Sequence, residues 1–150
     1  MRAILQRTNR AEVRAEGEVK GKIDQGLVIL LGVEEADAED DIQWLSGKIA
    51  KMRIFEDEER KMNKSLMDIG GRILLISQFT LHASVKKGNR PSFIKAAKPE
   101  KSIPVYNKVK KQLEEDTNTI VETGEFGAFM EVDFINDGPV TIFLDTKNKE

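Results

Sequence analysis

Short stretches in which hydrophobic and polar residues alternate dominate the first third of the chain, a pattern typical of β-strands. Glycines punctuate these stretches, which we predict to be strands over residues 3–6, 13–15 and 19–23. Residues 27–31 form an uninterrupted apolar run that ends at Gly32. Such a run predicts a strand that is buried on both faces.

The spacing of apolar residues then changes to three and four, which indicates one face of an α-helix. This helix follows Asp37, the predicted N-cap, and its apolar face carries Ile42, Leu45, Ile49 and Met52. A second helix is predicted from Ser102, with Pro104 in its first turn.

Three more strands are predicted after the first helix. Residues 72–81 lie between the two helices, and residues 129–135 and 140–144 follow the second. The segment 136–139 between the last two has the composition of a tight hairpin turn. The order of elements predicts an α+β fold over a single domain, residues 1–150: a compact β-rich unit with a largely antiparallel sheet or barrel and two main helices.

Composition narrows the possible classes of function. The 150 residues are 39% hydrophobic, enough for a folded core, and include no cysteine and one histidine. Disulfide scaffolds, thiolate zinc sites, cysteine nucleophiles and multi-histidine metal sites are therefore excluded. No apolar stretch approaches the length of a membrane span or of a signal peptide's core, so we expect a soluble cytoplasmic protein.

Positive charge is concentrated in residues 86–111. This segment holds nine basic residues and one acidic residue, a net charge of +8, while the rest of the chain carries −10. A charged segment can be no more than a solvated face. So large an asymmetry favours a polyanionic partner such as RNA.

Two polar segments are not explained by strand formation alone. In the first, Ser77-Gln78-Phe79-Thr80, polar side chains follow a buried apolar strand. Either the strand emerges into solvent there, or it directs hydroxyl, amide and backbone N–H groups into a pocket. In the second, Asn136-Asp137-Gly138-Pro139, the Gly-Pro bond could be cis and the turn could present rigid carbonyl groups to a ligand.

Several segments together resemble the D-aminoacyl-tRNA deacylase family. The resemblance rests on SQFTL at 77–81, GNRPSF at 88–93 and NDGPVT at 136–141. Four further segments also resemble this family: MRAILQR at 1–7, GLVILLGV at 26–33, MRIFED at 52–57 and TGEFGAFM at 123–130. They occur in the family's order and cover nearly the whole chain.

This resemblance implies a homodimeric hydrolase that needs no metal or organic cofactor and has neither DNA nor membrane as a partner. Its substrate would be the ester that joins a D-amino acid, or glycine mischarged on tRNA-Ala, to the terminal adenosine of tRNA. By the same resemblance, Gly138 and Pro139 form a cis peptide that enters the partner subunit's pocket and excludes L side chains.

The resemblance also implies roles for other residues. Ser77, Gln78, Phe79 and Thr80 form the catalytic segment, in which the Thr80 hydroxyl is the nucleophile or, alternatively, the backbone N–H groups of Phe79 and Thr80 stabilise the oxyanion and the 2′-hydroxyl of the terminal adenosine assists. We favour the second role because no base for Thr80 is evident. Further expected roles are adenosine binding by Phe126 and Met130, support of the Gly-Pro loop by Arg7, Asn136, Val140 and Thr141, and phosphate contacts by Lys86, Lys87 and Arg90.

Two other functions remain open from the sequence. One is a non-catalytic RNA-binding module of the same fold, which would release no amino acid. The other is a small-molecule D-amino acid esterase that uses Thr80 directly and needs no RNA.

Overall fold

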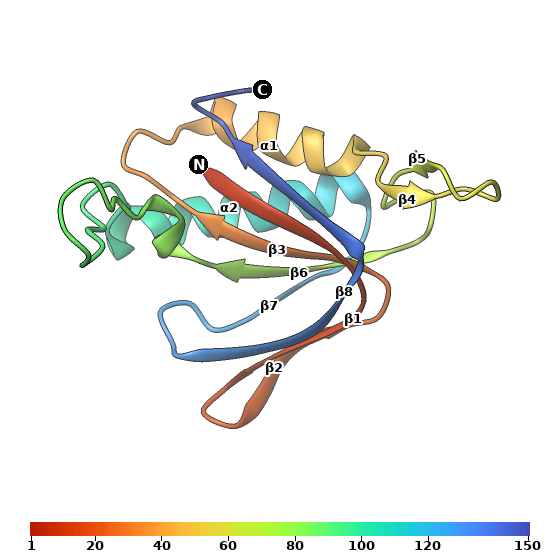
Figure 1. Cartoon of the computed structure of the whole chain (residues 1–150), viewed down its shortest axis with the longest axis horizontal. Helices are drawn as coiled ribbons and strands as arrows, with labels where there is room; N and C mark the ends of the chain where they lie inside the picture. Colours follow the sequence, from red (N-terminus) through yellow and green to blue (C-terminus); the bar gives the residue numbers. More distant parts are fainter.

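A computed structural model describes all 150 residues (Figure 1). Its main sheet contains the strands β1 (Arg2–Ala15), β2 (Glu18–Ile23), β3 (Gly26–Gly32), β6 (Arg72–Ser77), β7 (Val121–Thr123) and β8 (Met130–Asp145). Two α-helices, α1 (Glu39–Lys51) and α2 (Pro99–Thr117), pack on one side of this sheet. A short hairpin of β4 (Phe55–Glu56) and β5 (Met62–Lys64) and a 3₁₀ turn, η1 (Phe79–His82), complete the fold.

The sheet is mixed and strongly curled. Strand β1 is antiparallel to β2, β3 and β8, whereas β6 is parallel to both β3 and β7. Strand β2 approaches β7 so closely that a Cβ added to Gly21 would lie 2.7 Å from the carbonyl oxygen of Thr123. The predicted β-rich α+β class is confirmed as a nearly closed barrel with two covering helices, in which the antiparallel pairs surround β1.

The two longest strands are each continuous where the sequence predicted two separate strands: β1 includes both 3–6 and 13–15, and β8 covers nearly all of 129–135 and 140–144. Residues 136–139 do not form a hairpin turn, because both halves of β8 pair with the same strand, β1. The register shifts on either side of Thr8, which pairs with Asn136, while Gln6 pairs with Thr141. The extra residues of β8 therefore form a bulge in a continuous strand.

Three predicted element boundaries were also wrong. Strand β6 ends at Ser77 and not at residue 81 as predicted, because Phe79–His82 form η1. Helix α1 has Ala38 as its N-cap, because the side chain of Asp37 instead accepts hydrogen bonds from the Met1 ammonium group and the Glu34 N–H. Helix α2 begins at Pro99, since proline is well suited to a first turn.

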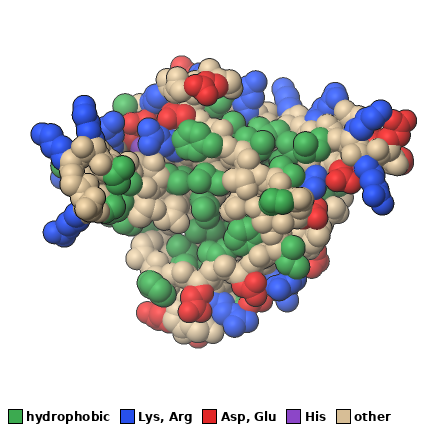
Figure 2. Space-filling model, viewed as in Figure 1, with side chains coloured by type: hydrophobic (Ala, Val, Ile, Leu, Met, Phe, Trp, Pro, Cys, Tyr) green, Lys and Arg blue, Asp and Glu red, His purple; other side chains and the backbone are tan.

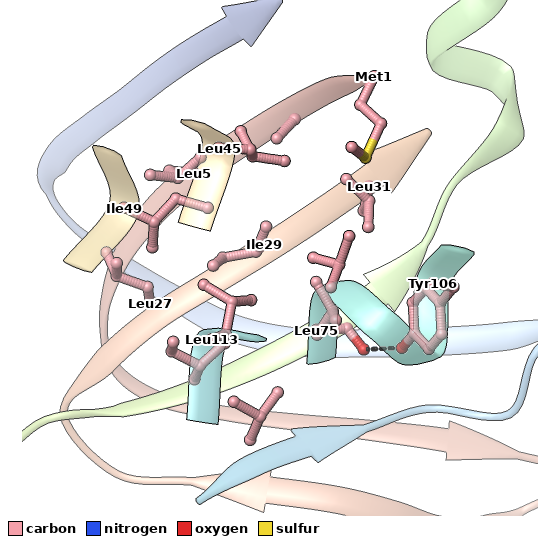
Figure 3. Close-up of a cluster of buried hydrophobic side chains, with 14 of the residues drawn as sticks. Met1, Leu5, Leu27, Ile29, Leu31, Leu45, Ile49, Leu75, Tyr106 and Leu113 are labelled. Carbon is pink, nitrogen blue, oxygen red and sulfur yellow. Dashed lines mark hydrogen bonds between the residues drawn. The ribbon is translucent and has the colours of Figure 1, made fainter. Parts of the chain in front are cut away.

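Hydrophobic side chains fill both sides of the sheet. Leu27, Ile29 and Leu31 of β3 belong to the larger cluster, which lies between the sheet and the helices (Figure 3). Val28 belongs to a smaller cluster with Leu74 and Ile76 on the other face. The prediction that residues 27–31 are buried on both faces is confirmed for four of them, Leu30 being partly exposed. Neither helix is long and apolar enough to cross a lipid bilayer.

Candidate active site

A pocket of about 460 Å³ opens where β6 ends. One wall is the end of β6 and the start of η1, with Ser77, Gln78 and Phe79. The opposite wall is the segment around Phe126 and the start of β8 with Met130, and the N-terminal turn of α2 closes one end. Five residues with predicted roles thus lie around one pocket, although the two walls, at residues 77–79 and 126–130, are far apart in sequence.

The polar segment reaches this pocket because β6 ends abruptly. Residues Ile73–Ile76 are buried, and the N–H of Gln78 continues the pairing with β3 by donating to the Leu31 carbonyl at 2.8 Å. The chain then turns into η1, so that the side chain of Phe79 becomes 57% exposed. As at the start of any helix, the first N–H groups of η1 lack partners within the turn. They are available to a ligand.

Thr80 differs from its three neighbours because it is not among the residues that line the pocket. Like Phe79, it is exposed. Its hydroxyl oxygen accepts a hydrogen bond from the side-chain amide of Gln78, and no acidic or basic side chain is hydrogen-bonded to it. The geometry therefore provides Thr80 with no general base within this chain.

Aromatic contacts hold both walls of the pocket in place. Phe126 packs edge-on against Tyr106 of α2 at a ring separation of 5.6 Å, and the Tyr106 hydroxyl donates to the Leu75 carbonyl at 2.7 Å (Figure 3). Burial raises the pKa of Tyr106, so its hydroxyl stays a neutral donor. Sequence reasoning missed Tyr106 in this role because a tyrosine on an apolar helix face looks the same as any core residue.

The Gly138–Pro139 peptide bond is cis. Arg7, a buried side chain, supports the bulge: its Nε donates to the Asp137 carbonyl at 3.1 Å and its Nη1 to the Ile54 carbonyl at 2.8 Å. Asn136 spans the bulge from the other side, since its Oδ1 accepts from the Val140 N–H at 3.1 Å and its Nδ2 donates to the Thr141 hydroxyl at 3.0 Å.

Within one chain, Gly138 and Pro139 do not line the Ser77–Met130 pocket. Both are exposed, and the outward row of β8 on either side of them contains the large apolar residues Ile135 and Phe143, which are 47% and 57% exposed. Hydrophobic side chains also gather across the middle of the face shown in Figure 2, with charged side chains around its edge.

The basic segment divides into two parts of different character. On α2, Lys108, Lys110 and Lys111 pair with Glu39, Glu114 and Glu115 at 3.4, 2.9 and 3.8 Å. Residues 83–98, which we call the basic loop, leave η1 at one end of the molecule, where Lys and Arg side chains project into solvent (Figures 1 and 2).

In the basic loop, Lys86, Lys87 and Arg90 are exposed and have no carboxylate partner. The loop also contacts the pocket wall, because Phe93 packs edge-on against Phe79 at a ring separation of 5.1 Å. Sequence reasoning placed Phe93 in a family motif but did not predict this contact.

No group of three or more His, Asp or Glu side chains lies close enough together to hold a metal ion. The single histidine, His82, lies on η1, where it is buried and its Nε2 has no hydrogen-bond partner.

Comparison with known proteins identifies the family. The model of the D-Tyr-tRNA(Tyr) deacylase family matches residues 4–145. The chain belongs to this family. It is 56% identical to the D-aminoacyl-tRNA deacylase of Bacteroides thetaiotaomicron and 55% identical to that of Flavobacterium johnsoniae, in both cases over 100% of each chain. Membership of the deacylase family makes the chain a hydrolase.

Two solved structures are similar to this fold. One, titled c-Myc DNA Unwinding Element Binding Protein, is 41% identical, with a TM-score of 0.91 over 97% of this chain and 98% of that chain. The other, a probable eukaryotic D-amino acid tRNA deacylase, has a TM-score of 0.81 over 95% and 97% of the two chains, and at 16% identity it supports the deacylase fold alone.

Proposed function

We propose that this chain hydrolyses the ester bond of D-aminoacyl-tRNA and releases the free D-amino acid and tRNA, in the cytoplasm and without a cofactor. Full-length similarity to proteins named D-aminoacyl-tRNA deacylase supports the substrate. The observation that carries the proposal is the pocket wall formed by Ser77, Gln78 and Phe79, where a strand end and a 3₁₀ turn present backbone N–H groups beside an apolar cavity. Glycine mischarged on tRNA-Ala is a second proposed substrate.

Stabilisation of charge is the main chemical task of this site. Water attacks the ester carbonyl carbon, and the oxyanion that forms accepts hydrogen bonds from the N–H groups of Phe79 and Thr80. The bond to the 3′-oxygen of the terminal adenosine then breaks, and that oxygen takes up a proton. We propose that the neighbouring 2′-hydroxyl of the substrate assists these proton transfers, because Thr80 has no general base of its own.

The terminal adenosine occupies the apolar part of the pocket in this proposal. Phe126 and Met130 are assigned to the adenine ring and Ser77 and Gln78 to the ribose, and the fact that all four line one pocket supports this assignment. The edge-on contact of Phe126 with Tyr106 supports this assignment, because it holds the ring in one orientation.

Rejection of L-amino acids is assigned to Gly138 and Pro139 of a second copy of the chain. They are exposed, they lie outside the pocket of their own chain, and apolar side chains of β8 flank them. A rigid backbone corner braced by Arg7 would clash with any L side chain, whereas a D-amino acid or glycine has only a hydrogen atom in that position. This proposal therefore requires a homodimer.

The basic loop is assigned to the tRNA backbone. Lys86, Lys87 and Arg90 have unpaired charges and are joined to the pocket wall through the contact between Phe93 and Phe79. Attraction to phosphates of the acceptor stem would be independent of nucleotide sequence.

The decisive experiment compares the release of amino acid from D-Tyr-tRNA and L-Tyr-tRNA, with EDTA present throughout. Rapid loss of the D form alone supports both the deacylase and its chiral selection. Cleavage of both forms retains the hydrolase but refutes the role of Gly138 and Pro139. Cleavage of neither form, with tRNA still bound, favours the non-catalytic RNA-binding module. Cleavage of a free D-amino acid ester at the same rate favours the small-molecule esterase.

A further inference from the structure

The turn η1 is held at both ends by contacts that lie outside the pocket. At its start, the N–H of Gln78 donates to the Leu31 carbonyl of β3 at 2.8 Å. Towards its end, the Leu81 carbonyl accepts a hydrogen bond from Nη1 of Arg2 at 2.9 Å. Carbonyl groups at the end of a helical turn have no partner within the turn, so an arginine there satisfies one of them.

Arg2 is itself fixed by a second contact. Its Nε donates to Oδ2 of Asp145 at 3.0 Å, and Arg2 and Asp145 are direct cross-strand neighbours on β1 and β8. The Asp145 carboxylate is only 12% exposed, and its other oxygen accepts from the Lys147 N–H at 2.9 Å. The guanidinium plane is therefore tied to the sheet on one side and to η1 on the other.

Close packing beneath η1 makes its position sensitive to this contact. Gly32, the other cross-strand neighbour of Arg2, lies directly against the turn. A Cβ at residue 32 would lie 2.9 Å from the Gln78 carbonyl oxygen, 3.0 Å from Cδ2 of His82 and 3.1 Å from Cβ of Leu81. The sheet thus limits movement of η1 from below while Arg2 restrains its end.

We infer that Arg2, oriented by Asp145, is a positioning residue for deacylation. This inference rests on the proposed function. Arg2 sets the place and orientation of η1, and thereby of the Phe79 and Thr80 N–H groups that stabilise the oxyanion. The hydrogen bond from Arg2 to the Leu81 carbonyl matters most in the transition state, because the N–H donors to the oxyanion act only at short distance and with correct alignment.

The test compares Arg2→Met with Arg10→Met in steady-state deacylation of D-Tyr-tRNA. Arg10 is a matched control, because it also joins β1 to β8, through Asp133 at 3.4 Å, but it is exposed and does not contact η1. We expect Arg2→Met to lower kcat by about 10- to 100-fold with KM changed less than about threefold, as for a misplaced catalytic group. Arg10→Met should retain the wild-type kcat.

Two further variants test the same positioning role if Arg2→Met folds poorly. Arg2→Lys retains the charge but lacks the planar fork that reaches Asp145 and Leu81 together, so kcat should remain low. Gly32→Ala displaces η1 from below while Arg2 and Asp145 are both retained, and it should also lower kcat.

Each outcome separates this inference from the proposed function. If the wild-type protein releases no D-tyrosine, the proposed function fails first. If the wild type is active and folded Arg2→Met retains its kcat, the positioning role is refuted and the deacylase stands. An equal loss of kcat in Arg2→Met and Arg10→Met would also refute it, because the effect would then follow from weaker pairing of β1 with β8.

Discussion

The basic loop makes a quantitative prediction about tRNA binding. We would change Lys86, Lys87 and Arg90 together to glutamine and compare this triple variant with Lys108, Lys110 and Lys111 changed in the same way. Both variants lose three positive charges from the same basic segment. They differ because the loop charges have no carboxylate partner, whereas each of the α2 lysines pairs with a glutamate.

The expected magnitude follows from counterion release. Each phosphate contact contributes a slope of about −0.7 to −0.9 to the logarithm of affinity against the logarithm of salt concentration. Relative to a 1 M reference, one contact at about 0.15 M salt is therefore worth roughly a four- to fivefold gain in affinity. Loss of all three contacts should weaken binding by about 50- to 150-fold and reduce the slope by about 2 to 3.

The assay is the dissociation constant for tRNA at four or five salt concentrations, with kcat measured at saturation. The α2 variant should retain most of the wild-type slope, because its charges are already paired within the protein and each exposed ion pair is worth only about 0.2–1 kcal/mol. Equal losses in the two variants would refute the reasoning, since only the total charge would then matter. An unchanged slope in the loop variant would place the tRNA on another surface.

Three further predictions concern single residues. Thr80→Ala should lower kcat by less than about tenfold, and a loss above about 10³-fold in single-turnover assays would identify Thr80 as the nucleophile instead. Tyr106→Phe leaves the Leu75 carbonyl without its side-chain donor and should destabilise the fold by about 1–2 kcal/mol in urea unfolding, a value near zero meaning that water replaces the hydroxyl. Burial opposes ionisation of Asp41, but hydrogen bonds, chiefly from Lys147, outweigh it and lower the pKa of Asp41 to about 2. The ionised carboxylate therefore adds stability of about 2 kcal/mol, fully present above pH 4 and lost as the pH falls towards 2. The loss in free energy of unfolding caused by Asp41→Asn, relative to the wild type, should become smaller as the pH falls from 4 towards 2. A loss that is independent of pH would contradict this assignment.

The elements with a strong period could be read from the sequence. The apolar run at 27–31 and the helical spacing of Ile42, Leu45 and Ile49 correspond to β3 and α1. Strands β4, β5 and β7 were missed because two or three residues are too few to display alternation. The N-cap was wrong because Asp37 binds the Met1 ammonium group, a contact between distant parts of the chain.

The candidate site was predictable in its residues but not in its geometry. A polar segment after a buried strand indicated Ser77 and Gln78, and the pocket includes both. A hairpin at 136–139 was the wrong expectation because turn-forming residues also suit a bulge, and only the pairing of both halves of β8 with β1 distinguishes the two. Arg2 gave no signal, because its partners Leu81 and Asp145 lie 79 and 143 positions away.

The pairing of β1 with β8 also has a consequence for biosynthesis. Arg2 pairs with Asp145 and Ala15 with Met130, so the ribosome makes β1 long before it makes the strand that completes the pairing of β1. Contacts of such large sequence separation slow folding, and they leave one edge of β1 open until β8 has emerged. Met130 and Val132 also line the pocket, so the nascent chain lacks a finished pocket wall until late in translation. Closure of the barrel and completion of the pocket therefore depend on the same step, the pairing of β8 with β1 after β8 has been synthesised.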